Sequence, residues 1–192
     1  MIYTTVKKDG FEGILFSGNR KKEKVVIVMS GSNGGMSLTE KEARFYQQNG
    51  IPALALALFK TKQTQKDLDR VPIEYVEKAI AWLKKRGYQR IAIDGTSKGS
   101  ELALLAGTMF PDITCVIARV PSYFVSEGLR ASGISKNPSG TSCWSYRGKR
   151  TTVCIVQGAE IQYAENAAEG KGIPYFDVQS RQTGHAGNNH SG

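Results

Sequence analysis

Four short apolar runs alternate with segments of helical periodicity between Val25 and Val120, and this alternation constrains the fold more than any other feature. The runs are VVIVM at 25–29, IPALALALF at 51–59, RIAID at 90–94 and ITCVIARV at 113–120. A strand that is apolar on both faces belongs in the middle of a covered sheet. The alternation therefore predicts an α/β fold, a mostly parallel sheet with helices on both faces.

The segments between the runs carry helix signals. Ser37-Leu38-Thr39-Glu40 has the capping-box pattern that opens a helix, and Asn49-Gly50 marks its expected end. A second helix is indicated by apolar residues at helical spacing: Ile73, Val76, Ile80 and Leu83. Before the first run, strand-like residues flank Asp9-Gly10, a dipeptide typical of tight turns, so residues 1–17 are expected to form a hairpin.

The third run leads directly into Gly95-Thr96-Ser97-Lys98-Gly99, which has the pattern G-x-S-x-G. In some folds this pattern places a serine on a sharp strand-to-helix turn and exposes its hydroxyl for attack on a carbonyl. The alternative is a serine in an ordinary strand-to-helix turn, as in many nucleotide-binding folds. The strand before the motif and the helix after it favour Ser97 as a nucleophile.

A glycine-rich loop, SGSNGG at 30–35, follows the first run at the end of the sheet where sites form in such folds. Serine attack creates an oxyanion that needs N–H donors. One expected donor is the backbone N–H of Lys98, and the loop should supply the other, with Asn33 and Gly34 favoured. The proposed oxyanion and substrate-binding loop comprises Gly31, Ser32, Asn33, Gly34 and Gly35. A phosphate-binding loop is the alternative, although neither common glycine signature of such loops is present.

A serine nucleophile also needs a histidine base and an acid that orients it. The chain has two histidines, His185 and His190, and Asp177 is the only aspartate after Asp112. Ser97, Asp177 and His185 follow one another in the order that this chemistry shows in such folds. The competing interpretation is that Asp177 and His185 belong to a disordered polar tail, because no strand pattern surrounds them.

Several other polar or aromatic residues are candidates for the site. Lys98 and Lys62 would suit anionic substrate groups, but each is expected to be a solvated lysine. Trp144 and Tyr146 would either line a pocket or pin their loop to the core. Solvated surface positions are expected for the remaining glutamates near or after the motif: Glu101, Glu127, Glu160, Glu165 and Glu169.

The bulk composition fits a globular protein with 40% hydrophobic and 22% charged residues and a net charge of +9. The positive charge is spread along the chain without any nucleic-acid-binding signature, so no nucleic-acid partner is expected. The three cysteines lack a metal-type spacing, and no signal peptide or membrane span is evident. The sequence therefore predicts a cytoplasmic protein without a metal or cofactor, and it leaves the oligomeric state open.

An ordered set of motifs resembles the C-terminal domain of acyl-CoA thioester hydrolases and bile acid-CoA:amino acid N-acyltransferases. The motifs are SGSNGG, ALALALF, VPIEYVEKAIAWL, IAIDGTSKGSELALLAG and SCWSYRGK, which extend over about residues 24–150. The resemblance implies an α/β-hydrolase fold, with Ser97 as the nucleophile and 31–35 as the oxyanion loop. Serine in place of cysteine at that position implies hydrolysis over acyl transfer.

The resemblance has departures that divide the chain into two parts. Residues 1–150 are expected to be the hydrolase core, and 151–192 an atypical polar tail. The family's N-terminal domain and the last hydrolase elements have no counterpart, as would follow from a truncated or frame-shifted reading of a longer gene. The expected function is cleavage of acyl-CoA or a related acyl ester through an acyl-serine. The alternatives are an incompetent hydrolase fragment or binding module, and a carboxylester or dienelactone-type hydrolase.

Overall fold

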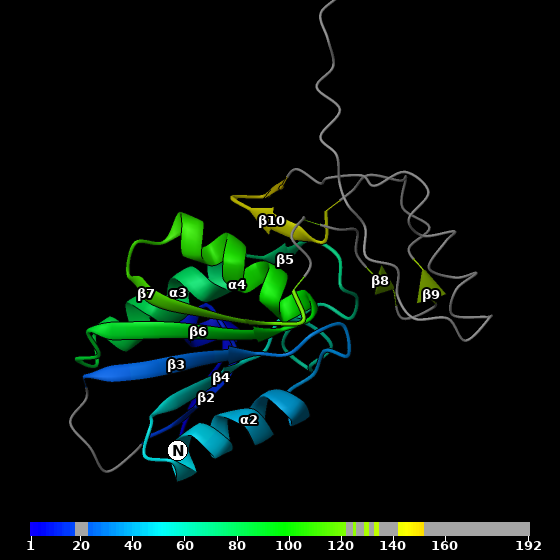
Figure 1. Ribbon diagram of the computed structural model, residues 1–192. Helices are drawn as coiled ribbons and strands as arrows, with labels where there is room; N and C mark the ends of the chain where they lie inside the picture. The colour runs from blue at the N-terminus through cyan, green and yellow to red at the C-terminus, as the bar shows by residue number, and fades with distance from the viewer. Residues whose placement is uncertain (18–22, 122–124, 126–128, 131–132, 135–141, 152–192) are drawn as a thin grey trace, which may run out of the picture. The chain divides into compact units, whose positions relative to one another are not determined.

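Six strands form the central sheet, in the order β1-β2-β4-β3-β6-β7 (Figure 1). The computed structural model describes residues 1–17, 23–121, 125, 129–130, 133–134 and 142–151. Four neighbouring strands are parallel to one another: β4 (Ala53–Leu56), β3 (Lys24–Met29), β6 (Arg90–Thr96) and β7 (Ile113–Arg119). β2 (Gly13–Phe16) is antiparallel to β4, and β1 (Ile2–Thr4) is antiparallel to β2. The predicted mostly parallel sheet is confirmed.

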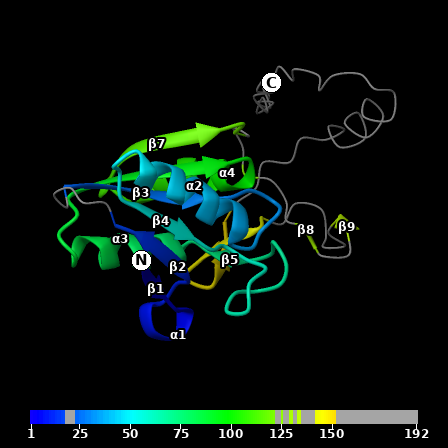
Figure 2. The same cartoon turned by 90° about the horizontal axis from the view of Figure 1, so that it is seen from below.

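Helices cover both faces of this sheet, as the alternating pattern predicted. α2 (Ser37–Gln48) lies on one face, and α3 (Glu74–Lys84) and α4 (Lys98–Met109) lie on the other (Figures 1 and 2). The position of β3 between two covered faces explains why its sequence is apolar from Val25 to Met29. Val25, Ile27 and Met29 join the core under α3 and α4, whereas Val26 and Val28 join a smaller core under α2.

A second, three-stranded sheet brings a distant segment next to the start of α3. Strand β10 (Trp144–Tyr146) pairs in parallel with β5 (Val71–Pro72) and antiparallel with β11 (Lys149–Arg150). Two further short strands, β8 (Leu129–Arg130) and β9 (Gly133–Ile134), form an antiparallel pair. None of the helices among the described residues is long and apolar enough to cross a membrane.

Two local signals in the sequence lead to different structures from those expected. Between β1 and β2 the chain forms the short helix α1 (Val6–Asp9), and Gly10 ends it with φ +83°. Thr5 caps this helix by accepting the Lys8 N–H at 3.2 Å, so Asp9-Gly10 does not make a two-residue turn. Helix α2 begins after Met36 without a side-chain cap. The expected capping box is absent because Ser37 is already the first residue of the helix, and Glu40 pairs with Arg44 at 2.6 Å.

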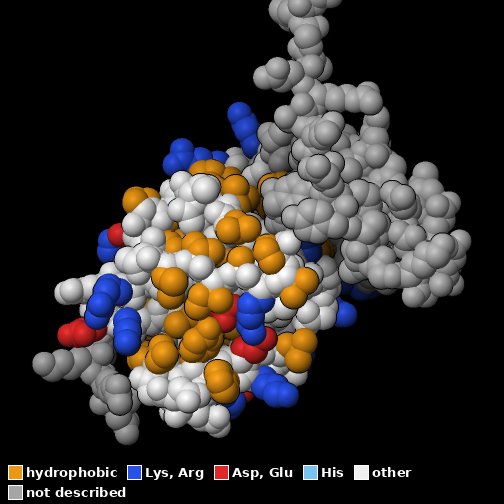
Figure 3. All heavy atoms as spheres, viewed as in Figure 1, with side chains coloured by type: hydrophobic (Ala, Val, Ile, Leu, Met, Phe, Trp, Pro, Cys, Tyr) orange, Lys and Arg blue, Asp and Glu red, His pale blue; other side chains and the backbone are white. Residues whose placement is uncertain are grey.

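The fourth apolar run is not the buried strand that its composition suggested. Within the described residues β7 pairs only with β6, so it lies at the edge of the sheet. Thr114 and Cys115 are exposed and the other β7 residues are half-buried. Figure 3 looks onto this edge and shows hydrophobic side chains gathered over β7 and α4. The order of strands, which the sequence pattern does not specify, determines this exposure.

Candidate active site

Ser97 lies on the turn between β6 and α4, with φ +53° and ψ −117°. Positive φ is uncommon for a residue with a side chain, and such strain concentrates at functional sites. The Ser97 N–H donates to the Arg119 carbonyl at 2.8 Å, and its own carbonyl accepts the Ser100 N–H at 2.9 Å and the Ser100 hydroxyl at 2.5 Å. The residue is exposed, although the next four are buried. The turn therefore holds the backbone firmly and leaves Ser97 accessible.

The two glycines of the motif let α4 cross closely over the strands. A Cβ on Gly95 would lie 2.1 Å from the Gly99 carbonyl oxygen. A Cβ on Gly99 would lie 2.4 Å from the carbonyl oxygen of Ser30. No side chain fits at either position, and this is the reason that the pattern G-x-S-x-G identifies the turn from sequence.

The glycine-rich loop at 31–35 packs against the Ser97 turn, as expected. A Cβ on Gly31 would lie 2.9 Å from the Thr96 carbonyl oxygen and 3.0 Å from the Ser97 Cβ. The N–H groups of Gly34 and Gly35 are directed elsewhere, to the carbonyls of Gly31 at 3.2 Å and Phe59 at 2.9 Å. The expectation that Gly34 donates to an oxyanion is therefore wrong for this conformation, because a turn within the loop uses its N–H.

Two other loop residues keep their backbone N–H groups available. Among the described residues, no acceptor lies on the backbone N–H of Ser32 or Asn33. The Asn33 side chain donates to the Gly34 carbonyl at 3.1 Å, and the Asn33 carbonyl accepts from the Lys60 ammonium at 3.4 Å. These contacts orient the peptide group that follows Asn33.

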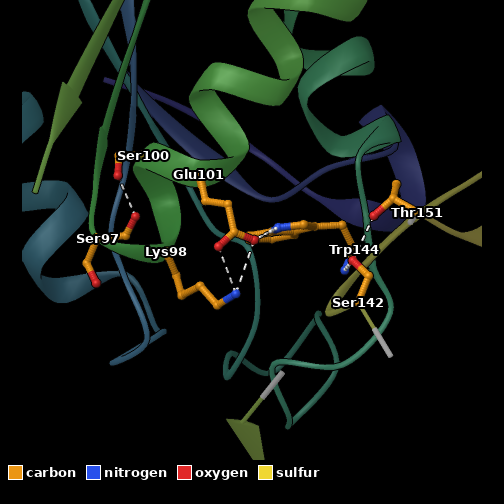
Figure 4. A network of polar contacts seen from close by, with 7 residues as sticks. All are labelled: Ser97, Lys98, Ser100, Glu101, Ser142, Trp144 and Thr151. Carbon is orange, nitrogen blue, oxygen red and sulfur yellow. Dashed lines mark hydrogen bonds and ion pairs between the residues drawn. The ribbon is translucent and has the colours of Figure 1, made fainter. Parts of the chain in front are cut away.

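Lys98 and Glu101 form a buried ion pair on the first turn of α4 (Figure 4). The Lys98 ammonium lies 3.1 and 3.0 Å from the two Glu101 carboxylate oxygens. The Trp144 indole N–H donates to Glu101 Oε1 at 2.6 Å. The exposed fractions are 8% for Lys98, 3% for Glu101 and 0% for Trp144. The expectation that Lys98 and Glu101 are solvated is therefore wrong, because Trp144 from β10 covers them. Trp144 pins its segment to the core.

The segment around Trp144 is itself held by polar contacts. The Ser142 hydroxyl accepts the Trp144 N–H at 3.0 Å and lies 2.7 Å from the Thr151 hydroxyl. Arg150 donates to the Ser142 carbonyl at 2.7 Å and to Asp69 at 2.7 Å. Between Ser142 and Trp144, burial raises the pKa of the Cys143 thiol to about 12, although the Lys98 charge opposes this shift. Trp144 therefore lies in a buried segment that several hydrogen bonds hold in place.

A second network on the α2 side of the turn was missed by the sequence analysis. Asp94, only 1% exposed, accepts from the Tyr46 hydroxyl at 2.7 Å and from Arg119 Nε at 3.0 Å. Arg119 also pairs with Glu42 at 2.6 Å. Burial first, and then the Asp94 carboxylate, raise the pKa of Tyr46. A charged residue within each of two apolar strands, IAID and ITCVIARV, was the signal available in the sequence.

The remaining predicted residues are placed as follows. Lys62 is exposed, and Tyr146 is half-buried with its ring packed against Phe110. The predicted base His185 and acid Asp177 lie outside the described residues, as do four of the glutamates: Glu127, Glu160, Glu165 and Glu169. The described site thus contains the Ser97 turn and the loop that faces it.

Comparison with solved structures addresses the fold. A putative dienelactone hydrolase from Klebsiella pneumoniae superimposes with a TM-score of 0.50, over 60% of this chain and 57% of that one, at 17% identity. The Butyrivibrio proteoclasticus protein Est1E, solved with ferulic acid, has a TM-score of 0.49 over 62% of this chain and 51% of its own, at 20% identity. The chain has the α/β-hydrolase fold.

Comparison with known sequences addresses the family. The human protein acyl-coenzyme A thioesterase 6 is 33% identical over 96 residues, which are 48% of this chain and 22% of the relative. The chain thus spans less than a quarter of that relative's length. A family model described as BAAT / Acyl-CoA thioester hydrolase C terminal matches residues 71–169, and so continues past Arg150, where the motifs ended. Because this match includes more than half of the chain, the protein belongs to the family of BAAT and acyl-CoA thioester hydrolase C-terminal domains.

Proposed function

We propose that this protein is a serine hydrolase that cleaves acyl-CoA thioesters through an acyl-Ser97 intermediate. The observation that carries the proposal is the exposed Ser97 at positive φ, on a strand-to-helix turn packed against a glycine loop. The thioester class is supported by the family and by the name of the human relative. The net charge of +9 also suits CoA, which carries several phosphate charges.

The proposed reaction has two acyl-transfer steps. The Ser97 Oγ attacks the thioester carbonyl carbon while a base takes its proton, and the carbonyl oxygen becomes an oxyanion. Collapse of this intermediate breaks the C–S bond, and the same proton leaves with the CoA thiolate. Water then attacks the acyl-serine by the same route, which releases a carboxylic acid and restores the Ser97 hydroxyl.

The oxyanion needs fixed N–H donors near the Ser97 hydroxyl. We propose the backbone N–H of Lys98 as one donor, since it begins α4 directly after the nucleophile. The second donor is assigned to Ser32 or Asn33, in place of Gly34, whose N–H is used inside the loop. Gly31 and Gly35 frame that loop, because Gly31 packs against the Ser97 turn and the Gly35 N–H donates to the Phe59 carbonyl. Loss of one such donor typically lowers kcat about 10²–10³-fold.

The base that accepts the Ser97 proton must come from a group that the Ser97 hydroxyl can reach. The Lys98 side chain does not serve, because its ammonium is paired with Glu101 and extends away from the Ser97 hydroxyl (Figure 4). The proposal therefore keeps His185 as the base and Asp177 as the acid that orients it. Both assignments rest on the order Ser97, Asp177, His185 in the sequence.

Substitution of Ser97 by alanine tests the nucleophile. The Ser97→Ala variant is expected to lose acyl-CoA hydrolysis to the background rate and to lose labelling by a fluorophosphonate probe, which reacts with activated serines. A matched control is Ser37→Ala, because Ser37 is an exposed serine at the start of another helix. Labelling and hydrolysis should be unchanged in that control. Unchanged turnover in Ser97→Ala would rule out the assignment.

The choice between thioesters and simple esters needs a separate measurement. The full chain should hydrolyse acyl-CoA with a higher kcat/KM than the p-nitrophenyl ester of the same acyl group. A preference for the simple ester would instead favour the carboxylester or dienelactone type. Absence of both activities and of probe labelling would favour the alternative of an incompetent hydrolase fragment or binding module.

A further inference from the structure

We propose that Trp144 is a positioning residue for the Ser97 site, acting through Glu101 on the first turn of α4. The inference rests on the proposed function of Ser97, because its consequence is measured on that serine. It assigns a role in the reaction to β10, which lies 43 residues after Glu101 in the sequence. Trp144 itself is not assigned a catalytic role, since it contacts Glu101 and not the Ser97 hydroxyl (Figure 4).

The buried pair of Lys98 and Glu101 needs further hydrogen-bond partners. A buried ion pair is favourable only when further hydrogen bonds satisfy its remaining polar atoms. Lys98 and Glu101 are within one helical turn, and their side chains are 10% and 2% exposed. The Trp144 indole donates to Glu101 Oε1 at 2.6 Å, a charge-assisted hydrogen bond of the strong kind. Trp144 therefore fixes where the carboxylate lies, and the carboxylate fixes the Lys98 ammonium.

This arrangement holds the Ser97 turn and the start of α4 in place. Ser97 and Lys98 are the last residue of the turn and the first residue of α4. The Glu101 N–H also donates to the Ser97 carbonyl at 3.2 Å, so the backbone of Glu101 is part of the same turn. A displacement of Glu101 would consequently be transmitted to the serine and to the proposed oxyanion donor. Errors of about 1 Å in such geometry can lower a rate by about a hundredfold.

Trp144 is itself held in place by its backbone, its strand and its burial. Its backbone N–H is held by Ser142, its strand pairs with β5 and β11, and its side chain is fully buried. The Lys98 ammonium lies 5.8 Å from the centre of its ring, a cation–π distance that adds a second contact to the pair. Trp144 is thus a fixed point against which the start of α4 is aligned.

The test compares the two tryptophans of the chain. Trp144→Phe removes the indole N–H and keeps an aromatic ring. Trp82→Phe is the matched control, because Trp82 is also buried and donates its indole N–H to a carboxylate, that of Asp9, at 3.2 Å. We expect Trp144→Phe to lower kcat for acyl-CoA and the rate of fluorophosphonate labelling by about ten- to a hundredfold with little change in KM. Trp82→Phe should retain wild-type values.

Hydrogen exchange gives a readout that does not depend on activity. The amides of residues 98–101 should exchange faster in Trp144→Phe than in the wild type, whereas Trp82→Phe should leave them unchanged. Wild-type kcat together with wild-type exchange in Trp144→Phe would overturn the inference, and so would equal acceleration of these amides in both variants. If the wild type proves unreactive, the proposed function fails, and the exchange of residues 98–101 alone decides whether Trp144 positions the turn.

A second variant covers the case in which Trp144→Phe does not fold. Glu101→Gln keeps the side-chain volume and an acceptor for the indole, but it removes the charge that holds Lys98. It should show the same pattern, a fall in kcat larger than any change in KM and faster exchange at 98–101. A Glu101→Gln variant with unchanged kcat and unchanged exchange would contradict the role assigned to this network.

Discussion

Two polar networks stabilise the Ser97 turn from opposite sides, and they differ in how deeply they are buried. On the side of α3 and α4, Lys98, Glu101 and Trp144 are almost wholly buried. On the side of α2, Asp94 is buried, but the side chains of its partner Arg119 and of Glu42 are 41% and 30% exposed. The first network is almost wholly shielded from solvent, whereas solvent reaches the outer members of the second.

The turn is therefore stabilised in two ways, by a buried ion pair on one side and by a half-exposed ion pair on the other. A dry ion pair is sensitive to the loss of either charge, because the remaining charge stays desolvated. A half-exposed pair contributes less, since water and salt screen it. Asp94 moreover has two donors, from Tyr46 and Arg119, and Arg119 has a second carboxylate in Glu42. The turn should therefore depend more on the network of Lys98, Glu101 and Trp144 than on the one around Asp94.

The largest effect on stability is expected from Glu101→Gln. Removing this charge leaves the buried Lys98 ammonium without its carboxylate, which should lower the free energy of unfolding by about 3 kcal/mol. Urea unfolding followed by circular dichroism measures the change. The control is Glu40→Gln, whose i,i+4 pair with Arg44 is exposed and should contribute about 0.5 kcal/mol or less. Similar losses in the two variants would remove the distinction between a dry and a solvated pair.

A smaller loss in the free energy of unfolding, about 1 kcal/mol, is expected from Asp94→Asn. The amide oxygen can still accept one hydrogen bond, and Arg119 keeps Glu42 as its partner. The same urea experiment checks this value against that of Glu101→Gln. Should Asp94→Asn prove the more damaging of the two, the Asp94 network would be the principal support of the turn.

The elements next to Ser97 were predictable because their signals are local. The glycines at 95 and 99 are required by contacts of 2.1 and 2.4 Å with neighbouring backbone, and such crossings leave a short sequence pattern. The inner strand β3 is apolar from Val25 to Met29 because both faces of the sheet are covered there. The placement of the glycine loop beside Ser97 follows from the parallel sheet, in which neighbouring strands end at the same edge.

The misjudged features depend on partners that are remote in the sequence. Glu101 resembles a surface glutamate on an amphipathic helix until Trp144, from 43 residues later, covers it. The apolar composition of β7 resembles that of an inner strand, although it is the edge strand of the sheet that the described residues form. The use of the Gly34 N–H depends on the internal turn of its loop, and the glycine content of the loop does not reveal that turn.

An effect of about the same size, which shrinks at alkaline pH, is expected from loss of the Tyr46 hydroxyl. Burial and the Asp94 carboxylate raise the pKa of Tyr46 above its ordinary value of 10.0, so the folded protein holds this proton more tightly than the unfolded chain. The resulting contribution to stability is complete below pH 10 and is lost as the pH rises through the folded pKa. In Tyr46→Phe the part of the loss of stability at alkaline pH that comes from Tyr46 should be absent.

Unfolding in urea between pH 8 and pH 11 isolates the contribution of Tyr46. At pH 8, Tyr46→Phe should be less stable than the wild type by about 1 kcal/mol, the value of one hydrogen bond. The gap should narrow above pH 10, because only the wild type loses the Tyr46 contribution there. The buried Tyr75 and Tyr88, whose pKa values burial also raises, titrate in both proteins and cancel in the difference. The exposed Tyr3→Phe is the control, and a stability difference that stays constant with pH would show that folding does not raise the pKa of Tyr46.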